Sequence, residues 1–517
     1  MFNDPRIHKP IFQPHLIASG LRDNATRNVV YFPDGTAQTG AEVAAEISRY
    51  EQALTSLGVR PGDKVALLSG NLPAALHVTN ATMFNESSLV SLHAMGSVAD
   101  HRFIAEDSGF ETIVFEPRKF AGTVQELKAV APQVKRFLSL GPCEFGQDLI
   151  ALAGTMTPRP LVSPELTGRE VFRLAYSGGT TGKPKAIAST HASVAAMFAI
   201  VLAEWEYPAE VRQLLCAPLS HSGTVAFLPS LLRGGSIHVL ERFDPLEVFQ
   251  AIEKYRITCI LLVPTMIYAL LDHPRIDEFD LSSLETIFYG ASSMSVTRLK
   301  EGIARFGNVF FQFYGQAEAP MTVTVLRKAE HDPDNPLRLA SCGRPVPWLD
   351  VTLLDPDGNE VAEGEPGEIC VRGPIVMDGY VGRPELTEEV FRQGWLHTGD
   401  VGVRDTDGFI RIVDRLKDMI ITGGFNVYPR EVEDALTSHP AVSAAGVFGV
   451  PDDHWGEAVT AAVVLREGQN ASAEELMAHV RRAKGVHQTP KVIHFVDALP
   501  LTPVGKPDKK ALRAKYS

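Results

Sequence analysis

The sequence predicts an α/β protein with a large N-terminal domain of βαβ sheets and a smaller α+β domain at its C-terminus. Short apolar strands alternate with amphipathic helical segments up to about residue 340, which indicates parallel sheet. Beyond that point, the turn dipeptides Asp357-Gly358 and Asp407-Gly408 separate short alternating strands, as in antiparallel hairpins. A charged pentapeptide at 414–418 precedes the last compact segment. A chain of 517 residues also exceeds what one hydrophobic core ordinarily holds.

Within the first part, each strand is a short apolar run that follows a turn signal. The helix expected over 243–255 is amphipathic and opens with Asp244 as N-cap and Pro245 at the first helical position. Further helices are expected from about Leu72, up to Asp272 and from about His191. The expected strands are 64–69, 112–115, 171–175, 257–263 and 283–290.

The second half divides into two units. Residues from about 340 to 413 predict a small antiparallel, barrel-like part that closes the N-terminal domain of residues 1–414. Residues 415–517 predict the C-terminal domain, with a hinge at 414–418. The expected elements around and beyond this boundary are strands 409–413, 419–421, 445–450 and 459–465 and a helix that begins at Pro429.

The composition limits the kinds of partner that the protein is expected to bind and indicates its cellular compartment. Hydrophobic residues make up 45% of the chain and charged residues 21%, as in ordinary globular proteins. The net charge of −13 argues against broad binding of nucleic acid or anionic membranes. Five cysteines without a CxxC pair and no apolar leader in the first twenty residues predict a cytoplasmic protein with reduced thiols. The run 257–271 is too short and too broken to span a bilayer, and a homodimer is left open.

Residues 176–186 read Tyr-Ser-Gly-Gly-Thr-Thr-Gly-Lys-Pro-Lys-Ala. Glycines let backbone N–H groups approach an anion, and the hydroxyls and lysines add donors and charge. The segment is not a Walker A loop, because Ser177 replaces its first glycine and Pro184 follows Lys183. It predicts a phosphate cradle of another design, placed between the strand 171–175 and a helix from about His191. A plain surface loop is the alternative.

Four further stretches follow this loop in order. They are Gln-Phe-Tyr-Gly-Gln-Ala-Glu at 312–318, Gly-Trp-Leu-His-Thr-Gly-Asp at 394–400, the segment 414–431, and Pro-Leu-Thr-Pro-Val-Gly-Lys at 500–506. Together with the loop, they cover nearly the whole chain and resemble the adenylate-forming superfamily, which contains acyl- and aryl-CoA synthetases, luciferases and nonribosomal peptide adenylation domains.

The resemblance implies a reaction in two halves with ATP, Mg²⁺ and coenzyme A. A carboxylate attacks the α-phosphate of ATP, which releases pyrophosphate and leaves an acyl adenylate. A thiol then displaces AMP. The resemblance also implies that the C-terminal domain is mobile and rotates between the two halves.

The resemblance assigns the phosphates and the metal to two segments. Lys185 and the loop should hold the β- and γ-phosphates, because charge that develops on a leaving group needs prearranged donors. Glu318 should bind Mg²⁺, together with Thr180. Ala317 departs from the threonine usual in this motif, and a water or Gln316 is expected to replace that hydroxyl. The loop residues implied in nucleotide binding are Ser177, Gly178, Gly179, Thr180, Thr181, Gly182 and Lys183.

The resemblance assigns the nucleoside to residues from three other segments. Asp400 should accept hydrogen bonds from both ribose hydroxyls, since a carboxylate has lone pairs for both. Arg415 should contact ribose or phosphate. Tyr314 is expected either to stack on adenine or to belong to the core. The other residues implied around the base are Gly290, Ala291, Gln312 and Gly315.

Four residues are implied in the switch between the half-reactions. Lys506 should bind the attacking carboxylate and the α-phosphate, because its ammonium offsets the repulsion between two anions. Lys417 falls at the hinge, Gly424 beside the pantetheine and His221 at the floor of the acyl site, where it gates access. Taken alone, each has an ordinary alternative: a solvated lysine, a turn glycine or a structural histidine.

The segments expected to line the acyl site are mostly apolar or small. They are 221–227, 264–268, 289–294 and 316–322, and they offer no lysine or arginine for a second carboxylate. An acid with a neutral, apolar tail is therefore expected, first a medium- or long-chain fatty acid and next an aryl or cyclic acid. The rivals are an enzyme that loads a carrier protein in trans, a light-emitting oxygenase and a non-catalytic binding protein, which Ala317 alone favours.

Overall fold

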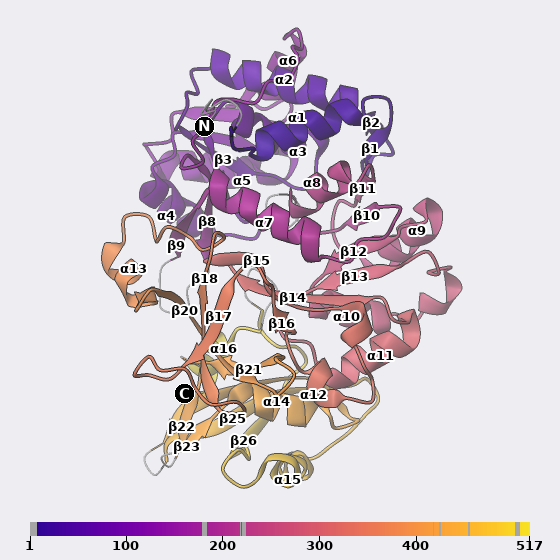
Figure 1. Cartoon of the computed structure of the whole chain (residues 1–517), viewed down its shortest axis with the longest axis vertical. Coiled ribbons are helices and arrows are strands. Elements are labelled where there is room, and N and C mark those ends of the chain that lie inside the picture. The colour runs from indigo at the N-terminus through magenta and orange to yellow at the C-terminus, as the bar shows by residue number, and fades with distance from the viewer. Residues whose placement is uncertain are drawn as a thin grey trace, which may run out of the picture.

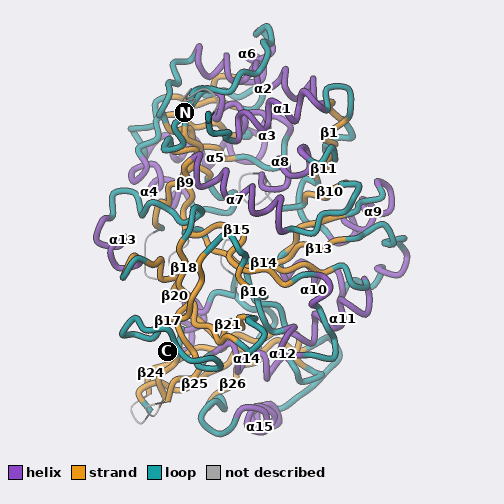
Figure 2. Tube along the Cα trace, viewed as in Figure 1, coloured by secondary structure: helices purple, strands orange, loops and turns teal. Residues whose placement is uncertain are grey.

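The computed structural model describes residues 8–177, 184–217, 219, 224–416, 418–422, 425–452, 455–501 and 507–517. Within these residues the strands form four sheets, and helices cover the sheets of the N-terminal part (Figures 1 and 2). The mixed α/β class with several parallel strands confirms the expectation from the sequence. None of the described helices is both long and apolar enough to cross a membrane.

A seven-stranded sheet carries the glycine-rich segment on its edge hairpin. Its order is β7-β6-β5-β3-β4-β8-β9, and all pairs are parallel except β8 with β9. Its strands are β3 (Lys64–Leu68), β4 (Ser88–Ser91), β5 (Thr112–Phe115), β6 (Arg136–Ser139), β7 (Gln147–Asp148), β8 (Val171–Ser177) and β9 (Lys185–Thr190). Every residue of β4 and β5 is buried, as expected for strands covered on both faces.

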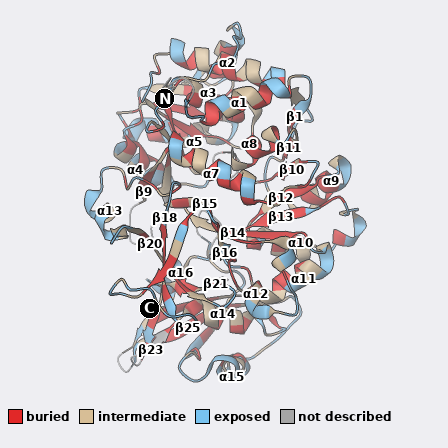
Figure 3. Ribbon diagram, in the orientation of Figure 1, coloured by how far each residue is buried: buried red, intermediate tan, exposed pale blue. Residues whose placement is uncertain are grey.

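A nine-stranded sheet forms the centre of the molecule (Figure 1). Its order is β16-β15-β14-β13-β12-β10-β11-β1-β2, with parallel pairs from β14 to β1 and antiparallel strands at both edges. Its strands are β1 (Asn28–Tyr31), β2 (Ala37–Thr39), β10 (Arg212–Leu215), β11 (Ser236–Val239), β12 (Cys259–Leu262), β13 (Thr286–Tyr289), β14 (Phe310–Gln316), β15 (Ala319–Leu326) and β16 (Arg344–Pro345). The interiors of these strands are largely buried (Figure 3).

The remaining two sheets lie in the second half of the chain. The third contains β17 (Asp350–Leu354), β18 (Pro366–Arg372), β19 (Phe391–Arg392), β20 (Trp395–Arg404) and β21 (Ile410–Arg415), all antiparallel as predicted. Among the described strands, the pairing does not close into a ring. The fourth contains β22 (Ile420–Thr422), β23 (Phe425–Val427), β24 (Val442–Asp452), β25 (Gly456–Leu465) and β26 (Val492–Phe495).

The helices begin where local signals place them. Asp244 caps α9 (Pro245–Tyr255) by accepting from the N–H groups of Leu246 and Glu247 at 3.0 and 3.2 Å, as its sequence predicts. The longer helices are α1 (Gln13–Asp23), α2 (Gly40–Ser56), α3 (Pro73–Phe84), α4 (Val98–Ser108), α5 (Pro117–Val130), α7 (His191–Glu204), α8 (Thr224–Leu232), α10 (Pro264–Leu271), α11 (Val296–Phe306), α14 (Pro429–Thr437), α15 (Ala473–Lys484) and α16 (Lys509–Tyr516). The shorter ones are α6 (Leu149–Gly154), α12 (Pro336–Leu339) and α13 (Pro384–Val390).

The expected strand–loop–helix order around the glycine-rich segment is wrong. β9 follows the segment and pairs antiparallel with β8, with Ala175 opposite Ile187 and Ser177 opposite Lys185. The apolar residues after Lys185 therefore complete a hairpin before α7 begins at His191. The segment joins two strands, so it does not open the N-terminus of that helix.

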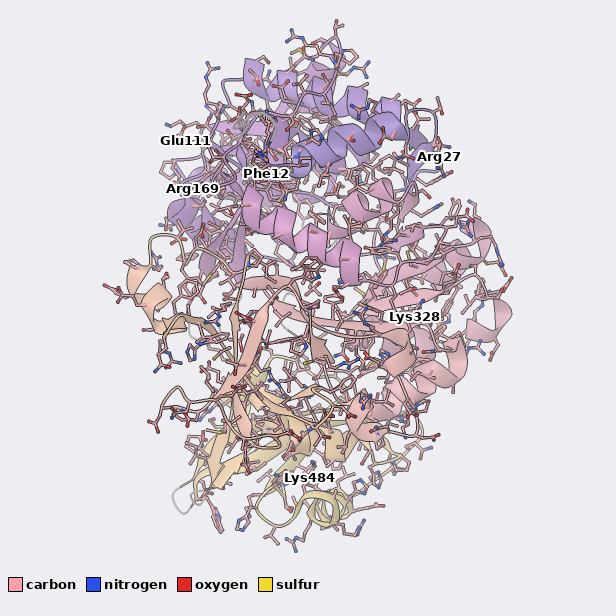
Figure 4. The ribbon with its side chains drawn as sticks, in the orientation of Figure 1. Phe12, Arg27, Glu111, Arg169, Lys328 and Lys484 are labelled. Atoms are coloured by element: carbon pink, nitrogen blue, oxygen red, sulfur yellow. The ribbon has the colours of Figure 1, made fainter. Side chains whose placement is uncertain are left out.

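The fourth sheet packs under the third at the lower end of the molecule, opposite α1 (Figure 1). Figure 4 labels Lys484 on α15 in the lower part of the molecule and Phe12 before α1 in the upper part. Arg466 donates to the Glu301 carboxylate of α11 at 3.3 Å, which ties the fourth sheet to the central part. The division at 414–418 stays a prediction.

Candidate functional site

One cavity of about 1890 Å³ connects the carboxyl ends of several strands with the C-terminal unit. It is lined by the end of β14, by residues 397–400 within β20, by β21, by the hairpin β8–β9 and by residues of α14 and α16. The cavity therefore lies where segments far apart in the sequence meet. The predicted site residues that line it are Lys185, Ala291, Gln312, Tyr314, Gly315, Glu318, Asp400 and Arg415.

Asp400 is the centre of a polar cluster in this cavity. Its Oδ2 accepts a hydrogen bond from the Tyr314 hydroxyl at 2.7 Å, and its Oδ1 accepts from Arg415 Nε at 3.1 Å. The Asp400 residue is only 5% exposed, so its charge needs these partners. The nearby carboxylate raises the pKa of Arg415. The structure thus brings together three residues that lie in three separate motifs.

Tyr314 is a partly buried residue that also faces the cavity, and its stacking on adenine stays a prediction. Its ring is partly buried at the end of β14 and lines the cavity. Its hydroxyl is the donor to Asp400, and burial together with that carboxylate raises the pKa of Tyr314 far above its usual value. The hydroxyl therefore stays protonated and serves as a fixed donor.

The backbone beside Tyr314 is packed too closely for larger residues. A Cβ atom at Gly290 would clash with the Phe313 carbonyl oxygen, and one at Gly315 would lie 2.8 Å from the carbonyl carbon of Met321. Ala291 has a φ of 67°, a left-handed value that is uncommon for a residue with a side chain. Such strain is typical of sites where the surrounding structure fixes the backbone.

Gln312 lies beside Tyr289, which begins one of the predicted wall segments, and Tyr289 in turn contacts His331, which the sequence did not reveal. The Tyr289 hydroxyl lies 3.3 Å from Gln312 Oε1 and 2.9 Å from His331 Nε2, while His331 Nδ1 lies 2.8 Å from the Arg327 carbonyl oxygen. Burial lowers the pKa of His331 to about 4, so the ring is neutral near pH 7. Since Nδ1 must donate to the carbonyl, Nε2 accepts the Tyr289 proton. The Tyr289 hydroxyl has one proton, so this chain of bonds ends at His331 and Gln312 Oε1 only lies near the Tyr289 oxygen.

Glu318 and Lys185 meet at a tyrosine that was also not anticipated. The Tyr380 hydroxyl donates to Glu318 Oε1 at 2.8 Å, and Lys185 Nζ lies 4.8 Å from the centre of the Tyr380 ring. The backbone continues this link, because Met377 N–H donates to the Glu318 carbonyl at 2.9 Å and Val381 N–H donates to the Ala186 carbonyl at 2.9 Å. The segment 377–381 therefore couples the two predicted phosphate-side residues.

The donor set at Glu318 fits a magnesium ion. Only Oε1 of the carboxylate receives the Tyr380 hydrogen bond, and Glu318 lines the cavity. A hard cation such as Mg²⁺ takes one or two carboxylates and completes its shell with phosphate and water oxygens. The second predicted ligand, Thr180, lies outside the described residues.

Helix faces contribute an apolar part of the cavity wall, beside the polar residues Gln13, Thr79 and Asn80 of the same helices. Predicted wall segments contribute Val225 and Phe227 from α8 and Pro264 from α10. Helices α1, α3 and α7 complete the wall with Ile17, Leu76, Met83, Val194, Met197 and Phe198. The contributions of α1 and α3 were not anticipated, because nothing local in those helices indicates what they face.

Several predicted residues lie outside the described part of the chain, as does the side chain of Ser177. Pro184, Leu501 and Pro507 flank two of these stretches and line the cavity. The residues concerned are Gly178, Gly179, Thr180, Thr181, Gly182, Lys183, His221, Lys417, Gly424 and Lys506.

Sequence comparison matches the AMP-binding enzyme family over residues 20–381 and the AMP-binding enzyme C-terminal domain over residues 431–506. The medium/long-chain-fatty-acid–CoA ligase FadD8 of Mycobacterium tuberculosis is 46% identical over 99% of this chain and 91% of its own length. A feruloyl-CoA synthase of an Amycolatopsis species is 38% identical over 93% of this chain and 94% of its own.

Solved structures agree with this over the whole fold. The amide bond synthetase McbA from Marinactinospora thermotolerans has a TM-score of 0.88 and 34% identity, covering 98% of this chain and 100% of its own. ATP-bound MatB from Rhodopseudomonas palustris has a TM-score of 0.87 and 28% identity, covering 97% and 99%. The chain therefore belongs to the AMP-binding enzyme family, the adenylate-forming superfamily that its motifs resemble.

Proposed function

We propose that the chain is an ATP-dependent acyl-CoA synthetase. It activates a carboxylic acid as the acyl adenylate with release of pyrophosphate, and then transfers the acyl group to coenzyme A with release of AMP. The observation that carries this proposal is a single cavity with two ends of different chemistry. One end presents Asp400, Arg415 and Glu318, and the other includes the apolar part of the wall formed by helix faces. The identity to fatty-acid– and feruloyl-CoA-forming relatives supports the same class.

At the nucleotide end, the proposed roles of Asp400 and Arg415 follow from the lone pairs and N–H groups that their mutual hydrogen bond and the bond to Tyr314 leave free. Asp400 keeps one further lone pair on each oxygen after its bonds to Tyr314 and Arg415, enough for two ribose hydroxyls. Arg415 has guanidinium N–H groups beyond Nε for the α-phosphate. Gln312, with Gly290, Ala291 and Gly315, surrounds the base.

At the phosphate end, Glu318 and Thr180 hold Mg²⁺ in this proposal. A bound Mg²⁺ would offset the negative charge of the phosphates. Lys185 places its ammonium beside the Tyr380 ring, where it meets the leaving pyrophosphate with the loop 177–183. Lys506 neutralises the encounter of the two anions, the carboxylate and the α-phosphate.

The second half-reaction depends on a change of domain orientation about 414–418. The family resemblance supports Lys417 as the pivot, Gly424 as a contact of the pantetheine and His221 as the residue that opens the route to the adenylate. Arg415 lies two residues before Lys417 and donates a hydrogen bond to Asp400. This contact supports a hinge that starts directly after a residue of the proposed nucleotide site.

We propose a medium- or long-chain fatty acid as the substrate. The apolar walls from α1, α3, α7 and α8 support a long, neutral tail, as does the identity to the mycobacterial ligase. An aryl acid is the second candidate, because the feruloyl-CoA synthases are 38% identical over most of the chain.

A screen of fatty, aryl and cyclic acids for AMP release, with and without coenzyme A, tests the proposal. We expect release that requires coenzyme A and is fastest with a fatty acid. Release with a carrier protein but not with coenzyme A would replace the second half of the proposal. If the protein consumed no ATP with any of the acids, the proposed acyl-CoA synthetase activity would be refuted.

We also propose a cytoplasmic location and a homodimer. All five cysteines are free thiols, which suits a reducing compartment. Fractionation of cells and sedimentation of the purified protein test these two points.

A further inference from the structure

Asp400 sits in a β-bulge of β20. In the pairing of β18 with β20, Glu368 lies opposite Val401 and Cys370 opposite His397, so two steps along β18 correspond to four along β20. The three residues 398–400 therefore face Ile369 alone, which makes two of them extra, and Gly399 has a φ of 72°. Bulges of this kind re-aim a side chain and interrupt the ladder of hydrogen bonds.

The bulge needs new acceptors for the N–H groups that leave the ladder. Gly399 N–H donates to Glu368 Oε1 at 2.9 Å, and Asp400 N–H donates to Thr398 Oγ1 at 3.1 Å. The Thr398 hydroxyl in turn donates to the Ile369 carbonyl at 2.7 Å. The side chain of Glu368 thus replaces a backbone acceptor of its own strand.

The other carboxylate oxygen of Glu368 fixes that side chain. Its Oε2 accepts from His397 Nδ1 at 2.6 Å and from Arg392 Nη2 at 3.2 Å. The Glu368 side chain is 11% exposed, so a carboxylate there depends on such donors. Glu368 is therefore held by Gly399 and His397 of β20, the strand that carries Asp400, and by Arg392 of β19.

We propose that Glu368 is a positioning residue for nucleotide binding. It holds the bulge at 398–400 in the conformation in which the Asp400 carboxylate reaches Tyr314, Arg415 and the ribose hydroxyls. The proposal rests on the ribose contact of Asp400 proposed above. Glu368 itself acts through the backbone of Gly399.

A metal ion is the competing explanation for this cluster. One ligand atom each of Glu368, Cys370 and His397 lie within 4.8 Å of one another. However, the Arg392 guanidinium lies 2.9 Å from His397 Nδ1, where its positive charge opposes a cation. Burial also raises the pKa of the Cys370 thiol to about 12, so it carries no charge as a ligand. The contacts favour an ion pair over a metal site.

The test measures binding of AMP and 2′-deoxy-AMP by calorimetry, which needs neither the acid nor turnover. The variants are Glu368→Leu, which removes the acceptor, and Glu368→Gln, which keeps an oxygen for the Gly399 N–H. We expect Glu368→Leu to weaken AMP binding about tenfold, the effect of one hydrogen bond to a charged group. Binding of 2′-deoxy-AMP should change less, and Glu368→Gln should recover most of the affinity.

Glu363→Leu is the matched control, because Glu363 is exposed on the turn just before β18. Glu368→Asp retains the charge but places the carboxylate one methylene farther from the Gly399 N–H. Its affinity for AMP tests the proposal if the leucine variant does not fold. Unchanged AMP affinity in a folded leucine or aspartate variant would overturn the proposal. So would stoichiometric metal in the purified protein that is lost in Cys370→Ser. A parent protein that binds AMP and 2′-deoxy-AMP equally would instead remove the ribose role of Asp400.

Discussion

Replacing Tyr380 by phenylalanine isolates one hydrogen bond of the proposed metal carboxylate. The hydroxyl that donates to Glu318 Oε1 at 2.8 Å is lost, whereas the ring beside Lys185 remains. A hydrogen bond to a charged acceptor contributes about 1.5–3 kcal/mol. The lower end applies here, because a water in the cavity can take the place of the hydroxyl. About 1.5 kcal/mol corresponds to a rate lowered by roughly tenfold.

The assay is acid-dependent exchange of pyrophosphate into ATP over a range of Mg²⁺ concentrations. We expect Tyr380→Phe to exchange about tenfold more slowly and to need more Mg²⁺, since Glu318 loses its fixed orientation. Tyr380→Ala should be slower again, because Lys185 then loses its contact with the ring. Tyr255→Phe, on α9 away from the cavity lining, serves as the control. Parental rate and parental Mg²⁺ dependence in folded Tyr380→Phe would refute the reasoning.

Three further outcomes can be checked separately. Lys506→Ala should abolish pyrophosphate exchange but spare thioester formation from supplied acyl adenylate, because its charge is needed only when two anions meet; equal loss of both halves would contradict that role. Gly424→Leu or Lys417→Pro should do the reverse, leaving exchange largely intact and blocking transfer to coenzyme A, and a comparable loss of exchange would show the hinge assignment to be wrong. Burial lowers the pKa of His101, His191, His238 and His331 to about 4, below the usual 6.5, so unfolding takes up protons between these values. The stability that these neutral rings confer should be complete above about pH 6.5 and fall by about 1.4 kcal/mol per pH unit per histidine as the pH drops toward 4. Thermal unfolding at several pH values measures this, and a midpoint that does not change down to about pH 4.5 would exclude it.

Local signals were sufficient where a residue acts on its own element. Asp244 and Pro245 predict the start of α9 because a capping side chain and a fixed φ both act within the first turn of the helix. The buried strands β5 and β13 follow from continuous apolar runs. The predicted order of elements after the glycine-rich segment was wrong because β9 pairs back onto β8 and is followed directly by the helical pattern from His191.

Residues of the candidate site could be predicted from the sequence only where they belong to a recognisable motif. Asp400, Tyr314 and Arg415 were expected from three motifs, and the structure brings them into direct contact. Tyr380 and Glu368 were missed because their partners lie 62 and 31 positions away, and neither residue looks unusual in its own strand or turn. Pairings at such distances depend on how strands register, which single-chain patterns do not reveal.

The cavity has walls of two kinds, and this separates two properties of the enzyme. The proposed nucleotide end is formed by β14 and by the bulge within β20, whereas the apolar part of the wall is formed by helix faces that include Ile17 and Leu76. Exchanging a bulky residue for a small one on those faces lengthens or shortens that part of the cavity without disturbing Asp400 or Glu318. Substitutions on these helix faces can therefore change which acid the protein accepts, while the residues proposed for activation of the acid stay unchanged.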